Sequence, residues 1–110
     1  MSSDTFVAYF GLKFEVNADE IEAIELRSDP RVATARRAGL KYYFGNFAGL
    51  QENNLMFVGA QLGILGPENS RFIDIELGQL QQLIDKTKTA LVDAGFEGTP
   101  SLHLQWQPDI

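Results

Sequence analysis

Residues 5–16 have the sequence TFVAYFGLKFEV, in which two sets of side chains alternate with a period of two. The first set is rich in phenylalanine and comprises Phe6, Ala8, Phe10, Leu12 and Phe14. The second set is more polar and comprises Val7, Tyr9, Gly11, Lys13 and Glu15. A period of two over this length is typical of a β-strand with one buried face. The stretch therefore predicts a sheet whose phenylalanine-rich face packs against helices.

Two short helices are predicted directly after this strand. Asn17 is a favourable N-cap, and acidic residues follow it in the first turn, where the helix dipole favours negative charge. This helix should end near Ser28, because the residue before a proline is disfavoured in the α-helical conformation. Asp29 can cap a second helix that has Pro30 at its first position, and Gly39 can end that helix.

Four further strands are predicted along the rest of the chain. Aromatic and β-branched residues favour strands at residues 40–47 and 55–65, with a loop or hairpin turn at residues 48–54. Alternation predicts a short strand at Arg71–Leu77 and a last strand after Pro100.

The longest helix is predicted for Gln79–Ala94, where apolar residues recur at steps of three and four. The residues expected to face the sheet are Leu80, Leu83, Ile84, Thr87 and Leu91. The last strand has an apolar set that is also expected to turn toward the helices, and this set is Leu102, Leu104 and Trp106.

These elements predict one α+β domain over residues 1–110. Its sheet should be largely antiparallel, with four to five strands, helices on one face and the order β-αα-β-β-β-α-β. Without the short strand at Arg71–Leu77, the order is the βαββαβ arrangement of ferredoxin-like folds.

Charge and composition exclude several classes of partner. The chain has 15 acidic and 9 basic residues and a net charge of −6, so it should repel nucleic-acid backbones and anionic membrane surfaces. No apolar run approaches the ~20 residues of a membrane span. The chain has no cysteine, which excludes disulfides and thiolate metal sites and favours a cytoplasmic location. Residues 1–4 also lack the pattern of a signal peptide.

No catalytic, metal or cofactor motif is present in the sequence. Gly59–Gly66 is rich in glycine, but it has neither the spacing of a dinucleotide loop nor the Gly-Lys of a phosphate-binding loop. Its glycines instead indicate bulges or close backbone packing. The basic residues gather at Arg27, Arg31, Arg36, Arg37 and Lys41. Acidic residues precede this group closely, so internal ion pairs are expected there rather than an anion site.

A ligand site, if the protein has one, is predicted on the helix-free face of the sheet around Tyr9, Tyr43 and His103. Tyr9 and His103 belong to the more polar faces of the first and last strands, which lie side by side in a ferredoxin-like sheet. Their aromatic surfaces and hydrogen-bonding tips suit either a ligand or a protein partner. Tyr43 is placed less firmly, because its strand does not alternate cleanly and a shift of one residue reverses its faces.

Two functions follow from these observations. The first is a non-enzymatic module that associates with itself, as a homodimer, or with another protein, because aromatic residues are abundant and catalytic motifs are absent. The second is a small-ligand-binding protein or cofactor-independent enzyme of the dimeric α/β-barrel type, which would use the open sheet face. A deep apolar pocket walled by His103 or Tyr43 would favour the second function, and a flat or filled face would favour the first.

Overall fold

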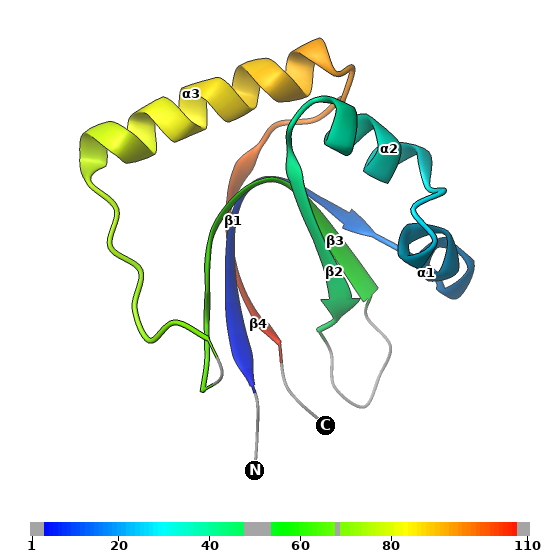
Figure 1. Ribbon diagram of the computed structural model, residues 1–110, viewed down its shortest axis with the longest axis horizontal. Coiled ribbons are helices and arrows are strands. Elements are labelled where there is room, and N and C mark those ends of the chain that lie inside the picture. Colours follow the sequence, from blue (N-terminus) through cyan, green and yellow to red (C-terminus); the bar gives the residue numbers. More distant parts are fainter. Residues whose placement is uncertain (1–3, 48–53, 68, 108–110) are drawn as a thin grey trace.

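The described part of the chain is an arched antiparallel sheet with three helices (Figure 1). The computed structural model describes residues 4–47, 54–67 and 69–107. Along the chain the elements are β1 (Thr5–Glu15), α1 (Ala18–Glu25), α2 (Pro30–Arg37), β2 (Lys41–Asn46), β3 (Asn54–Leu65), α3 (Leu77–Asp93) and β4 (Ser101–Gln107).

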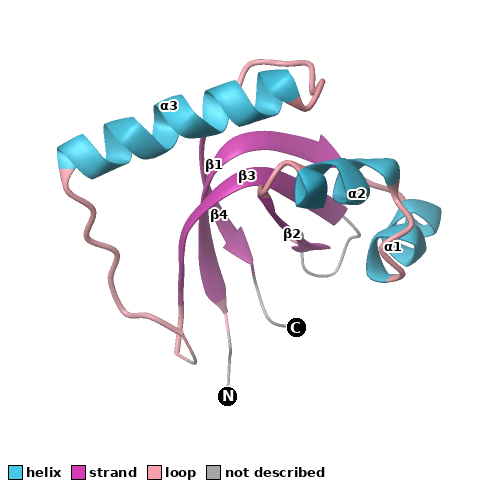
Figure 2. Cartoon of the chain, turned by 45° about the horizontal axis from the view of Figure 1, so that its top comes forward, coloured by secondary structure: helices cyan, strands magenta, loops and turns pink. Residues whose placement is uncertain are grey.

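The four strands lie in the order β2-β3-β1-β4, and every neighbouring pair is antiparallel. The helices cover one face of this sheet (Figure 2). They bury a cluster on that face to which each helix contributes, through Ile24 of α1, Val32 and Ala35 of α2, and Leu91 of α3. The α+β class, the antiparallel sheet and the one-sided helical layer predicted from the sequence are thereby confirmed.

The short strand predicted at Arg71–Leu77 does not form. Residues 71–76 have no regular secondary structure, and the preceding residues make only an isolated bridge between Leu65 and Ser70. The alternation there has another cause. The side chain of Ile73 lies over Gly63 of β3, in the space that a β-carbon would occupy. An extended segment that packs on a sheet alternates as a paired strand does, so the pattern alone does not separate the two.

The helix starts follow the sequence closely. Asn17 accepts a hydrogen bond from the backbone of Glu20, whose carboxylate accepts one from the Asn17 backbone, which completes a capping box. Asp29 caps α2 with Pro30 at its first position. The turn predicted at residues 48–54 lies outside the described residues except for Asn54, which begins β3.

Two facing glycines bend the central strands. Gly11 of β1 lies opposite Gly59 of β3, with φ of 157° and 154°. A β-carbon on Gly11 would lie 2.1 Å from the Val58 carbonyl oxygen, and one on Gly59 would lie 2.2 Å from the Phe10 carbonyl oxygen. Only glycine allows the two backbones to approach so closely. Both strands, β1 and β3, are curved along their length (Figure 1).

The arch gives the protein a second, smaller core on the helix-free face. It consists of Val7, Tyr9, Phe47, Leu55 and Phe57, with Tyr43 packed against it. The two edge strands meet across this core, where the Tyr43 hydroxyl of β2 donates a hydrogen bond of 2.5 Å to the Gln107 side chain of β4. The sheet therefore curls toward its helix-free face, which is filled by its own side chains.

Candidate interaction surface

The three residues predicted to form a ligand site lie together on the helix-free face. Tyr9 of β1 is directly opposite His103 of β4, and Tyr43 of β2 is opposite Phe57 of β3. The Phe57 ring contacts both Tyr9 and His103, with its centroid 5.9 Å from that of Tyr9 and 5.4 Å from that of His103. Tyr43 joins the group through Phe47, whose ring contacts both Tyr43 and Phe57. The predicted face is thus correct for all three.

The polar tips of these residues are bonded within the protein. The Tyr9 side chain is fully buried, and its hydroxyl donates to Gln61 Oε1 at 3.1 Å. Burial raises the pKa of Tyr9, and repulsion from Tyr43 raises it further, while burial also raises the pKa of Tyr43. His103 Nε2 lies 3.0 Å from the Gly11 carbonyl oxygen, which can only accept, so Nε2 carries the proton. The polar groups of Tyr9, Tyr43 and His103 are therefore engaged in hydrogen bonds within the protein.

The three best-formed hollows of the described residues are lined by side chains other than Tyr9, Tyr43 and His103. The side chains of the second core occupy the space under the arch instead. The ligand-binding role of the three residues remains a prediction that nothing in this geometry tests.

The apolar residues of β4 turn toward the helix side of the sheet, as predicted, but the helices do not bury them. Leu102, Leu104 and Trp106 are 55 %, 62 % and 48 % exposed. They do lie on the helix side, since their partners on β1 are Phe10, Ala8 and Phe6. The helices leave them uncovered because α3 packs mainly against β1 and β3, and α2 against β2.

Together with one neighbour, these residues form a continuous apolar surface. Phe6, at the start of β1, is 37 % exposed, and its ring meets that of Trp106 edge-on at 6.0 Å. We call Phe6, Leu102, Leu104 and Trp106 the β4 patch. A hollow of about 690 Å³ adjoins the patch and is lined by Asp4, Phe6, Leu65, Gly66, Pro67, Arg71 and Trp106.

The backbone edge beside the β4 patch has no charged side chain on it. Among the strands of the described residues, β4 pairs with β1 alone. Its sequence, Ser-Leu-His-Leu-Gln-Trp-Gln, contains neither Lys, Arg, Asp nor Glu. Natural sheets commonly protect an exposed edge with charges, prolines or bulges that prevent pairing with another chain. The opposite edge strand, β2, has a charge of this kind, because it begins with the exposed Lys41. β4 therefore has the composition of an internal strand at an edge position.

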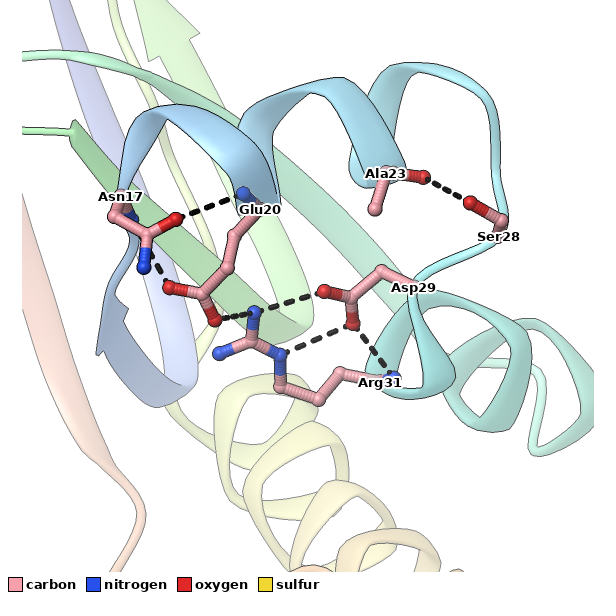
Figure 3. Close-up of polar contacts among 6 residues, drawn as sticks. All are labelled: Asn17, Glu20, Ala23, Ser28, Asp29 and Arg31. Atoms are coloured by element: carbon pink, nitrogen blue, oxygen red, sulfur yellow. Dashed lines mark hydrogen bonds and ion pairs between the residues drawn. The ribbon is translucent and has the colours of Figure 1, made fainter.

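The basic residues predicted to form internal ion pairs include one that does so clearly. Arg31 contacts Glu20 at 2.8 Å and Asp29 at 2.9 Å (Figure 3). Its guanidinium also lies over the Phe14 ring. Hydrogen bonds from Arg31 hold the pKa of Asp29 below its usual value. These contacts join α1, α2 and β1, which is a structural role.

A second hollow lies between α2 and α3 and was not predicted. It measures about 810 Å³ and is lined by Thr34, Arg37, Ala38, Asp85, Lys86, Thr89, Ala90, Asp93 and Ala94. Charges of both signs occur along it, so it has no preference for one class of ionic ligand.

Comparison with protein-family models, with curated proteins and with solved structures finds no match to the chain. Within the described ranges, no three His, Cys, Asp or Glu side chains are grouped so that they could hold a metal ion. None of the helices in those ranges is long and apolar enough to span a membrane.

Proposed function

We propose that the protein is a non-enzymatic module that binds a second copy of itself through the β4 patch. The observation that carries this proposal is the exposure of Leu102, Leu104 and Trp106 on a strand whose free edge bears no charge. Contiguous apolar surface on a folded protein marks an interaction site, whereas single exposed apolar residues need no explanation.

The driving force for association is the removal of this surface from water. Full burial of a leucine or phenylalanine side chain contributes about 1.5–3 kcal/mol relative to full exposure. The four side chains of the patch are between one-third and two-thirds exposed, and a symmetric dimer covers part of this surface on both copies. The gain must offset the loss of translational and rotational freedom, so we expect a dimer of modest affinity.

The net charge of the chain favours association through β4, which bears no charged residue. Two chains of charge −6 repel each other at long range, so the contact is expected where acidic side chains are fewest. β4 has none, and Asp4 of the adjoining hollow lies in the same lining as Arg71. Salt screens this repulsion, with a Debye length of about 8 Å at physiological ionic strength. Association should consequently tighten as salt is raised, whereas a basic protein partner would be bound less tightly.

The filled helix-free face supports this function over the ligand-binding alternative. A protein of the dimeric α/β-barrel type would use that face as the wall of a cavity, but Tyr9 and Phe57 are fully buried there. The strand order β2-β3-β1-β4 supports assignment to the ferredoxin-like folds, which host many functions. The fold therefore does not decide between the two functions, and the β4 patch favours the first.

The setting of the interaction is proposed to be the cytoplasm, which the absence of cysteine supports. Nucleic acids and anionic membranes are not expected as partners because of the excess of acidic residues.

The test is the mass of the protein in solution over a hundredfold range of concentration, measured by light scattering and sedimentation. The wild-type protein should shift from monomer to dimer with rising concentration. Leu104→Lys should remain monomeric, because it places a charge at the centre of the patch on each copy. Leu26→Lys is the matched control, since Leu26 is 71 % exposed at the end of α1, outside the patch.

The control variant should dimerise as the wild type does. Circular dichroism and melting temperature establish that both variants are folded. A wild-type protein that stays monomeric over the whole range contradicts the proposal, as does a dimer that Leu104→Lys leaves intact.

A further inference from the structure

Within the described residues, no strand pairs with the outer edge of the β4 backbone, although the Gln107 side chain at its end bonds to Tyr43 of β2. β4 is the last strand of the sheet, so every second residue directs its N–H and C=O groups away from β1. Such an edge pairs readily with a strand of another chain. The side chains that would interfere, charged residues or an internal proline, are absent from Ser101–Gln107.

We propose that two copies join edge to edge, with β4 antiparallel to the β4 of the partner. This proposal rests on the proposed function and specifies its geometry. The two four-stranded sheets then form one continuous sheet of eight strands. A twofold contact of this kind uses the same edge on both copies, so the assembly closes as a dimer and leaves no free β4 edge for a third copy.

The alternation of β4 fixes the register. Directly opposite residues in an antiparallel pair point to the same face of the sheet. The twofold axis must therefore pass midway between one residue of β4 and the same residue of the partner's β4. With Leu104 at the axis, all seven residues of Ser101–Gln107 are paired. With His103 or Gln105 at the axis, only five of the seven would be paired within β4, which favours the register centred on Leu104.

This register matches side chains of like character on both faces. On the helix side, Leu104 meets the partner's Leu104, and Leu102 meets the partner's Trp106. On the other face, His103 meets the partner's Gln105. The side chains of the two β4 patches thus pack against each other across the new strand pair, which removes their facing surfaces from water. Polar residues meet polar residues on the other face.

The absence of cysteine from the chain permits a direct test by disulfide formation. Opposite residues of an antiparallel pair have α-carbons about 4.5–5.5 Å apart, within the range that a disulfide can join. Leu104→Cys should therefore form a covalent dimer under mild oxidation. Leu102→Cys alone should not, because its symmetry mate lies four residues along the strand, about 13 Å away.

A mixture of Leu102→Cys and Trp106→Cys should give the crosslinked heterodimer in place of either homodimer. This second pair also keeps the test decisive if Leu104→Cys weakens folding. Leu26→Cys measures crosslinking by random collision and should give only a trace of dimer. Sedimentation of each reduced variant shows whether it still associates.

The outcomes separate this geometry from the proposed function. Efficient crosslinking of Leu104→Cys and of the Leu102/Trp106 mixture, well above the Leu26→Cys level, is the expected result. If the reduced variants dimerise but crosslink no better than Leu26→Cys, or if Leu102→Cys crosslinks to itself, the edge pairing is overturned and self-association stands. If no variant and no wild-type protein dimerises, both proposals are overturned.

Discussion

Gly11 and Gly59 show how single residues set the shape of this sheet. Each occupies a position where a β-carbon would lie within 2.2 Å of a carbonyl oxygen of the other strand. The sequence indicates that Gly59, inside a strand, marks a bulge or a close backbone approach. It does not indicate which residue Gly59 meets, because that depends on the register of β1 with β3.

Gly59→Ala should lower the free energy of unfolding by at least about 2 kcal/mol, because backbone atoms rather than a flexible side chain would have to move. Gly78→Ala is the matched control. Nothing lies within 4 Å of a β-carbon at Gly78, which is the second residue of α3, so alanine should stabilise the helix by up to about 1 kcal/mol. Denaturant unfolding of both variants measures the difference, and equal effects would show that the glycine pair does not constrain the arch.

Arg31 carries a testable dependence of stability on pH. Arg31→Met removes the partner of the buried Asp29 and should cost about 1–3 kcal/mol at pH 7. The pKa of Asp29 is lowered in the folded protein, so its carboxylate stabilises the fold above the unfolded pKa of about 4. That contribution is lost as pH falls through the folded pKa.

The stability of the wild type should therefore decline more steeply below pH 4 than that of Arg31→Met. Urea unfolding at pH 7, pH 4 and lower pH measures both slopes. Arg36→Met, at an exposed position of α2, should change stability by less than about 0.5 kcal/mol and leave the acid slope unchanged. Parallel declines in wild type and Arg31→Met would contradict this account of Asp29.

At the scale of elements, α3 was predicted well in position and less well in depth of burial. The helix spans Leu77–Asp93 against a predicted Gln79–Ala94. Thr87 and Leu91 are buried as expected, whereas Leu80, Leu83 and Ile84 are only half-buried. Helical periodicity identifies the inner face of a helix, but it does not show how far along its length a sheet extends beneath it.

Substitutions along α3 should reproduce this gradient. Leu91→Ala removes a side chain that is 2 % exposed and should cost about 2–5 kcal/mol. Leu83→Ala should cost clearly less, because its site is already partly open to water. Val92→Ala, on the exposed face, should change stability by less than about 0.5 kcal/mol. An equal loss for Leu83→Ala and Leu91→Ala in denaturant melts would place both in the core.

The orientation of β4 was predicted correctly, whereas its exposure to solvent was not predicted. Alternation placed Leu102, Leu104 and Trp106 correctly on the helix side, with His103 on the other face. They are exposed nevertheless, because α3 packs mainly against β1 and β3, and α2 against β2, which leaves β4 uncovered. The sequence does contain one relevant signal, which is that β4 is uncharged although it is the last strand of the predicted order.

For the molecule as a whole, local patterns were sufficient to predict the class and much of the element order. Period-two alternation, the capping residues Asn17 and Asp29, and the periodicity of α3 are all written in neighbouring residues. The second core and the β4 patch depend instead on the curl of the sheet and on which strands the helices cover. These are properties of contacts between distant segments, such as the bond from Tyr43 to Gln107, and no local pattern encodes them.

The central claim is that β4 is the surface through which two copies meet, and hydrogen–deuterium exchange tests it most directly. The exchange of the backbone amides of Ser101–Gln107 is compared at concentrations where the protein is monomeric and where it is dimeric. The account predicts slower exchange in β4 at the higher concentration, with the amides of α1 and α2 unchanged. Exchange in β4 that is identical at both concentrations, while the protein dimerises, would contradict it.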